Sequence, residues 1–232
     1  MVLQMTPFEQ FGINIKSAEN YIGMYIELRK LKELGRRGKL DEENRYLMWL
    51  PRAAIVASVA AFDAYIHQIL YFQLPELLSD ESAVISDELA DLIKRVMPTK
   101  KTEQVNDAIR LIRSHAGPRL LADLLRENIL KFESYQDPAK VIRAFKLLSI
   151  WDIFSEIAAR EQNKNKSRDE ITKDLSKYVK RRNQIVHESD LDSNNEPRAI
   201  TPDYAEKCLI FIQVLVRSMN RIVFPKQGIA QQ

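Results

Sequence analysis

The chain has 232 residues, of which 45% are hydrophobic and 29% are charged, the composition of a globular protein large enough to bury a core. Six glycines and few β-branched runs favour helices over a sheet, and a net charge of +3 is too small to indicate a nucleic-acid binder by itself. The one cysteine excludes a disulfide framework and the first residues lack an export signal, so we expect a single cytoplasmic domain over residues 1–232.

Glycine and capping residues mark the first helices. We expect the first one from Phe8 to Leu34, because Gly35 follows as a helix stop. Asp41 can cap a second segment, which leads into Pro51 and a kink.

An apolar stretch over residues 53–74 comes next and should close at Pro75. It is about as long as a membrane span, but Asp63 and His67 lie near its middle, where an unpaired charge is costly in lipid. We therefore expect a buried helix of a bundle and no association with a membrane.

The remaining helices are delimited by prolines and capping residues. Residues 75–136 have a shorter, interrupted periodicity and predict smaller helices inserted within the domain. Long helices are expected over residues 137–160 and 167–187, and a last, central one from residue 201. The predicted fold is all-α, a bundle of four long up-and-down helices with an inserted region of shorter helices.

One charged side chain interrupts the apolar stripe of the helix at 167–187. At about 100° per residue, Arg182 falls near the centre of that stripe. Burying an unpaired guanidinium costs several kcal/mol, so Arg182 should lie at a subunit interface, in a solvated cleft, or against a carboxylate or phosphate. The stripe consists of Ile171, Leu175, Tyr178, Ile185 and Val186.

The same helix ends on a histidine. An arginine followed five positions later by a histidine occurs by chance in roughly one chain in four of this length, and Arg110 with His115 is such a pair here. Requiring an asparagine after the arginine reduces the chance to about one in a hundred. Arg182, Asn183 and His187 are therefore the better candidate site.

The spacing within this site leaves two arrangements open. Asn183 and His187 share a helix face, whereas Arg182 and His187 are about 140° apart. Either the helix ends at His187 and the ring swings towards the arginine, or two chains combine their residues across a twofold axis, which we prefer. The alternative is a structural Arg182 and a helix-terminal His187 stabilised by the helix dipole.

Asp63 is a second out-of-place charge, a carboxylate on an apolar face that also carries Arg52. We expect it to be buried and paired, with Arg182 as the first candidate and Arg52 or His67 as the others. The pair is either a structural network or a support that orients Arg182 or His187.

Other patterns add little. No glycine-rich phosphate loop, zinc motif or nucleophile-elbow serine is present, so we expect no cofactor and no metal. Basic clusters at 94–101 and 164–182 are most simply solvated faces. The acidic loop at 188–192 could attract a cation, but a solvated loop is the simpler interpretation.

The string Arg-Asn-Gln-Ile-Val-His at 182–187 resembles the motif of the HEPN superfamily of α-helical RNA-cleaving and nucleotide-binding domains. Together with Arg181, Glu188 and the segments 52–56 and 62–67, it resembles the RiboL-PSP-HEPN branch. Residues 75–136 do not contribute to this resemblance.

The resemblance implies a metal-independent endoribonuclease that works as a homodimer, with Arg182 and His187 of both chains in one cleft. An imidazole would move the 2'-hydroxyl proton or protonate the leaving oxygen, and a guanidinium would hold the phosphate. Asn183 would orient either group, with Arg181 and Asp63 in support. The products would be 2',3'-cyclic phosphate and 5'-hydroxyl ends.

The family also implies a biological setting. Its members commonly serve as toxins or antiviral effectors restrained by an antitoxin or other regulatory protein, and we expect RNA rather than DNA as the substrate. Catalytically inactive members that bind nucleotide, RNA or a partner protein are the alternative.

Overall fold

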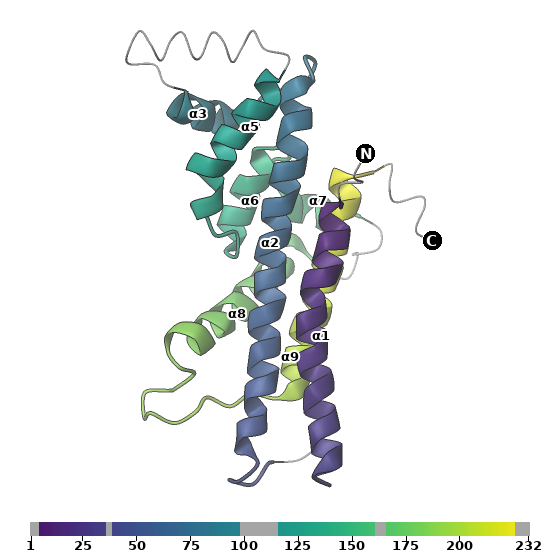
Figure 1. The fold of residues 1–232 in the computed structure, drawn as a ribbon, viewed down its shortest axis with the longest axis vertical. Helices are drawn as coiled ribbons and strands as arrows, with labels where there is room; N and C mark the ends of the chain where they lie inside the picture. The colour runs from purple at the N-terminus through teal and green to yellow at the C-terminus, as the bar shows by residue number, and fades with distance from the viewer. Residues whose placement is uncertain (1–4, 36–38, 98–115, 161–165, 226–232) are drawn as a thin grey trace. The chain divides into compact units, whose positions relative to one another are not determined.

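The computed structural model describes residues 5–35, 39–97, 116–160 and 166–225 (Figure 1). Within these ranges the regular structure is helical and contains no β-strand, so the predicted all-α class is confirmed. Arg110 and His115 lie outside the described residues. The chain forms two compact units, which we call the terminal unit (residues 1–62 and 169–232) and the middle unit (residues 63–168).

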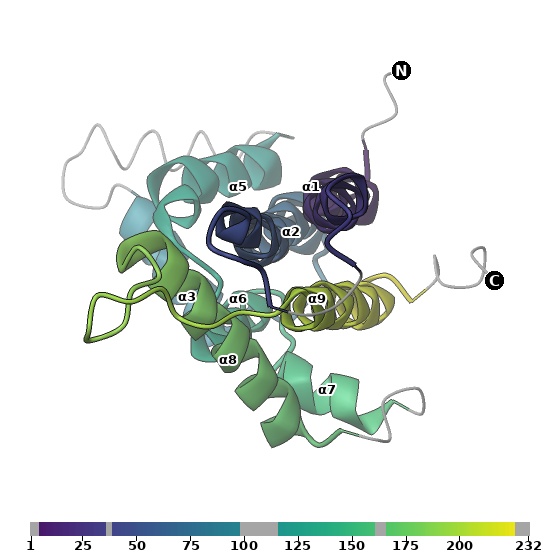
Figure 2. The same ribbon diagram turned by 90° about the horizontal axis from the view of Figure 1, so that it is seen from below.

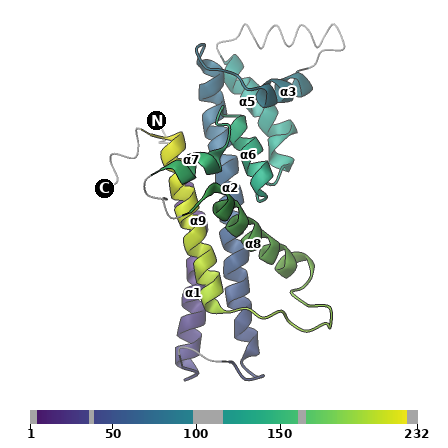
Figure 3. The ribbon, with the colours of Figure 1, turned by 180° about the vertical axis from the view of Figure 1, so that it is seen from behind.

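The terminal unit contains parts of all four long helices. Helices α1 and α9 contact each other and lie side by side in all views (Figures 1, 2 and 3), whereas α8 is inclined to both. A regular up-and-down bundle is therefore not confirmed. The elements are α1 (Pro7–Leu31), the 3₁₀ turn η1 (Arg45–Met48), the first part of α2 (Trp49–Ser79), α8 (Arg168–His187) and α9 (Pro202–Val223).

Side-chain caps explain where the outer helices begin. The Thr6 hydroxyl accepts from the Glu9 amide and the Glu9 carboxylate accepts from the Thr6 amide, so a full capping box starts α1. The Thr201 hydroxyl accepts from the Tyr204 amide at the start of α9, as the sequence predicted. Helix α1 ends three residues earlier than expected, at Leu31.

Helix α2 does not close at Pro75, so that prediction was wrong. The helix continues to Ser79 with the proline inside it. A proline removes its own N–H donor and its ring crowds the carbonyl four residues before it, but helical bonding resumes beyond Pro75 with Asp80 N donating to Glu76 O at 3.1 Å. By length and composition the segment 45–79 could cross a membrane, but 56% of its most apolar window is buried inside the protein, as in a core helix.

The middle unit consists of short helices. The single helix predicted over residues 137–160 was wrong, because Ser149 takes a left-handed φ of 61° that interrupts it. Asp152 then caps a new helix by accepting from the amides of Phe154 and Ser155. The elements are the end of α2, α3 (Asp87–Val96), α5 (Gly117–Asn128), the turn η2 (Leu130–Phe132), α6 (Pro138–Lys146) and α7 (Ile153–Ala159).

The core of the terminal unit is built on α9, which the sequence placed at the centre of the protein. Its fully buried side chains include Cys208, Ile212 and Val216. Helix α8 contributes Leu175, which is also fully buried. Because one face of α8 packs into this core, the opposite face of the helix is exposed to solvent.

Candidate functional site

The site predicted from the sequence lies at the C-terminal end of α8. The helix begins at Arg168 and ends at His187, close to the predicted bounds. It ends because Ser189 and Asp190 both take left-handed φ values, 51° and 58°. The Asp190 amide turns back to donate to Gln184 O at 3.0 Å, which satisfies one of the last carbonyls of the helix.

Arg182, Asn183 and His187 are brought together at this end. Arg182 Nη1 donates to Asn183 Oδ1 at 3.1 Å and lies 3.5 Å from His187 Nε2. A guanidinium only donates, so a hydrogen bond between them requires an unprotonated Nε2 and a proton on Nδ1. This tautomer presents Nε2 as a base. Of the two arrangements left open, the single chain adopts the first, with the histidine ring reaching the arginine.

The surroundings of Arg182 differ from those of a core residue. The side chain is partly exposed, although its Nε is buried and has no hydrogen-bond partner within the described part of the chain. Val186, which we placed in the same apolar stripe, is 46% exposed. The stripe therefore opens to solvent near the end of α8, and the expected carboxylate partner of Arg182 is not seen there.

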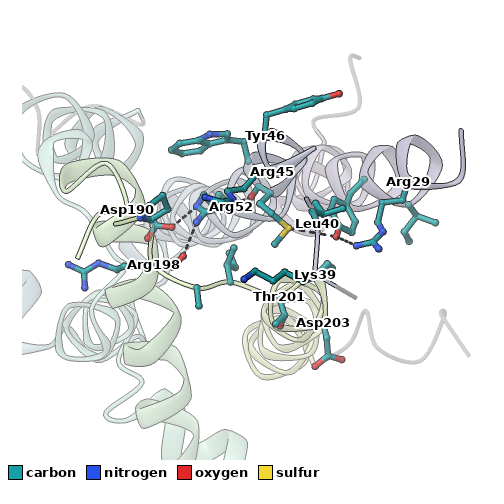
Figure 4. A pocket seen from close by; sticks show the side chains of 18 of the residues that line it. Arg29, Lys39, Leu40, Arg45, Tyr46, Arg52, Asp190, Arg198, Thr201 and Asp203 are labelled. Carbon is teal, nitrogen blue, oxygen red and sulfur yellow. Dashed lines mark hydrogen bonds and ion pairs between the residues drawn. The ribbon is translucent and has the colours of Figure 1, made fainter. Parts of the chain in front are cut away.

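A buried ion cluster lies beside this site and was not predicted. Asp190 is 1% exposed and accepts from two arginines: Arg52 Nε at 2.5 Å, and Arg181 through both Nη1 and Nη2, the latter at 2.9 Å. The two guanidinium side chains are only 7% and 11% exposed. Figure 4 shows Arg52 and Asp190 pointing towards one another.

Main-chain carbonyls accept further hydrogen bonds from the two arginines. Arg52 donates to Met48 O at 2.9 Å and to Arg198 O at 2.8 Å, and Arg181 donates to Ala199 O at 3.3 Å. The cluster therefore joins the start of α2, the end of α8 and the loop before α9. It fixes the turn that directly follows His187.

Asp63 has other partners than the cation we expected. Its carboxylate accepts from the Tyr135 amide at 2.5 Å and from Gln136 Nε2 at 3.4 Å. His67 on the next turn of α2 contacts Glu133 O at 3.2 Å through Nε2. These contacts lie within the middle unit. The donors to Asp63 are uncharged amides of the connection before α6, whereas we had expected a charged partner.

An open groove of about 2090 Å³ lies next to the ion cluster (Figure 4). It is lined by the second half of α1, the turn η1 and the loop at 189–201, with Arg52 and Asp190 in its wall. Basic and acidic side chains line it in nearly equal numbers, so it has no charge preference for a phosphate. Sequence reasoning missed it because its walls come from segments far apart in the chain.

The described residues hold no metal-binding cluster, and the one cysteine is buried. Among the described residues, no group of three or more histidine, cysteine or acidic side chains could hold a metal ion. Cys208 is a free, buried cysteine, and burial raises the pKa of its thiol to about 12. It is the apolar filler that the sequence indicated.

An all-helical chain that ends one long helix on arginine, asparagine and histidine has the features expected of a HEPN-type domain. The RiboL-PSP-HEPN family matches residues 19–224, and the chain belongs to this family. The match runs through 75–136, the region that we had not connected with the family. No curated protein and no solved structure shows significant similarity to the chain.

Proposed function

We propose that the protein is a metal-independent endoribonuclease that leaves 2',3'-cyclic phosphate and 5'-hydroxyl ends. The observation that carries this proposal is the contact of Arg182 Nη1 with His187 Nε2 at 3.5 Å, with Asn183 on the same guanidinium. Membership of the HEPN family supports an RNA-related role. The contact is long enough for a phosphate to open it and take the guanidinium donors for itself.

The reaction needs a base, a charge stabiliser and an acid. His187 Nε2 accepts the 2'-hydroxyl proton while that oxygen forms a bond to phosphorus, and Arg182 stabilises the charge that develops on the non-bridging oxygens. The bond from phosphorus to the 5'-oxygen then breaks, and this oxygen takes up a proton. Asn183 holds the guanidinium in position.

In an in-line displacement the entering 2'-oxygen and the leaving 5'-oxygen lie on opposite sides of phosphorus, so one imidazole does not reach both. His187 is the sole histidine at this end of α8 within the described residues, and it serves as the base. We therefore propose a twofold homodimer in which the partner's His187 protonates the leaving oxygen. A role as a toxin or defence effector restrained by a regulatory protein is part of the same proposal and follows the family.

The test is cleavage of single-stranded RNA in the presence of EDTA. His187→Ala and Arg182→Ala should each lower the rate by about 10²- to 10⁴-fold, the contribution of positioned acid–base catalysis. His67→Ala is the matched control, because it removes the other described histidine, whose Nε2 contacts Glu133 O at 3.2 Å. Cleavage that survives both site variants, or that needs a divalent metal, would refute the proposal. No cleavage together with tight binding of nucleotide, RNA or a protein would favour an inactive binding module.

A further inference from the structure

The exposed face of α8 carries a row of lysines that leads to the proposed catalytic histidine. Lys173, Lys177 and Lys180 are all exposed, and at 100° per residue they and His187 lie within about 60° of Lys180 around the helix. The buried residues of α8, such as Leu175, hold this face outwards. We call Lys173, Lys177 and Lys180 the lysine face.

These three lysines have no carboxylate partner within the described part of the chain. Some other exposed lysines are paired with acidic residues one turn away, as Lys16 is with Glu19 at 3.0 Å and Lys207 with Asp203 at 2.8 Å. Lys177 lies against aromatic rings, with its Nζ 5.0 Å from the Tyr204 ring centroid, but its charge stays unneutralised.

The spacing on the lysine face has an electrostatic cost. Lys173 and Lys177 are four residues apart, and Lys177 and Lys180 are three apart, positions at which like charges destabilise a helix. Successive lysines of the row are only about 4.5–6 Å apart along the helix axis, less than the Debye length of roughly 8 Å at physiological ionic strength, so salt screens their repulsion incompletely. A polyanion laid along α8 would relieve this repulsion.

We propose that the lysine face is the track along which the backbone of single-stranded RNA reaches His187. Lys173 and His187 are fourteen positions apart, a rise of about 21 Å along the helix, so the row is long enough to contact several successive phosphates. Lysines bind phosphates as flexible point charges and need no fixed geometry. They can therefore hold the RNA backbone whatever its base sequence. This inference rests on the proposed ribonuclease function, and it adds the path of the strand.

The experiment measures binding separately from cleavage. The probe is a fluorescent 12-nucleotide single strand of 2'-O-methyl RNA, which cannot be cleaved through a 2'-hydroxyl, and its Kd is measured at several KCl concentrations. The test variant is Lys173→Gln/Lys177→Gln/Lys180→Gln. The matched control is Lys16→Gln/Lys94→Gln/Lys207→Gln, which removes three charges from exposed lysines that have acidic partners.

Each lost phosphate contact lowers the slope of log Kd against log salt by about 0.7, so the test variant should lose about 2. The ratio of the variant's Kd to that of the unaltered protein should then be roughly 18-fold larger at 50 mM than at 200 mM salt. The control should keep the original slope. An unchanged slope in the test variant, an equal loss in the control, or binding of polyglutamate without binding of RNA would overturn the proposal.

The two proposals fail in different ways. If the slope falls as expected but no RNA is ever cleaved, the track stands and the ribonuclease function is wrong. If RNA is cleaved through His187 but the slope is unaffected by the test variant, the function stands and the strand follows another path.

Discussion

Asp190 is the residue whose replacement should harm the protein most. It is 1% exposed and is the one carboxylate that Arg52 and Arg181 share among the described residues. Asp190→Asn removes the charge but keeps the left-handed φ of 58°, which asparagine tolerates well. The variant therefore isolates the ion cluster from backbone strain.

Removing one partner of a buried ion pair costs about 3–5 kcal/mol, because the charge left behind has neither water nor a counter-ion. Here two guanidinium groups are left facing each other, so the upper end of that range is expected. A domain is stable by only about 5–15 kcal/mol, and the loss is a large part of it. In a urea titration with an m-value of about 3 kcal/mol/M, the midpoint should fall by at least 1 M.

Glu188→Gln is the control for this measurement, because it removes a nearby carboxylate from a surface pair with Arg198 in which Glu188 is 51% exposed. Such pairs contribute about 0–1 kcal/mol. A double-mutant cycle of Asp190→Asn with Arg52→Met should show a coupling above about 1 kcal/mol. If Asp190→Asn costs no more than Glu188→Gln, or if its effects add to those of Arg52→Met, the cluster does not fix the turn after α8.

Three further outcomes are expected. Light scattering at micromolar concentration should give the mass of a dimer, and a monomer would remove the second imidazole from the mechanism. Asp63→Ala should cost about 1.5–3 kcal/mol through the lost bonds from Tyr135 and Gln136, while RNA cleavage by the folded protein is retained; a specific loss of cleavage would give Asp63 a role in the site. Burial raises the pKa of Tyr178 and Tyr204 to about 12, so the stability tied to their neutral forms is complete below pH 10 and is lost as the pH rises from 10 to 12. Tyr204→Phe should therefore lose less stability than the unaltered protein between pH 9 and 11, and equal losses would contradict the assignment.

Helix existence and most helix starts could be predicted because caps are local. Thr201 acts within three residues of its own position, so its role is visible in the sequence. The break at Ser149 was missed because a left-handed serine has no sequence signature comparable to that of glycine. Pro75 misled us in the other direction, because helical hydrogen bonding resumes beyond it and α2 continues to Ser79.

In the candidate site, too, contacts between residues close in the sequence could be predicted and contacts between distant residues could not. Arg182, Asn183 and His187 lie within six residues, so one helix end brings them together and the sequence suffices. The bond between Arg52 and Asp190 joins residues 138 apart, and no periodicity carries that information. Arg52 was recognisable as a charge in an apolar helix, but its carboxylate lay in a loop that we had interpreted as solvated.

The separation of Arg52 from Asp190 also sets the order of events during synthesis. A ribosome adds about 5–20 residues per second, so the 138 residues between them take roughly 7–28 s to make. Throughout that time Arg52 has no carboxylate from the loop. A nascent chain therefore holds Arg52 without this carboxylate until residue 190 has been translated, and the start of α2 cannot be joined to the end of α8 through Asp190 before then.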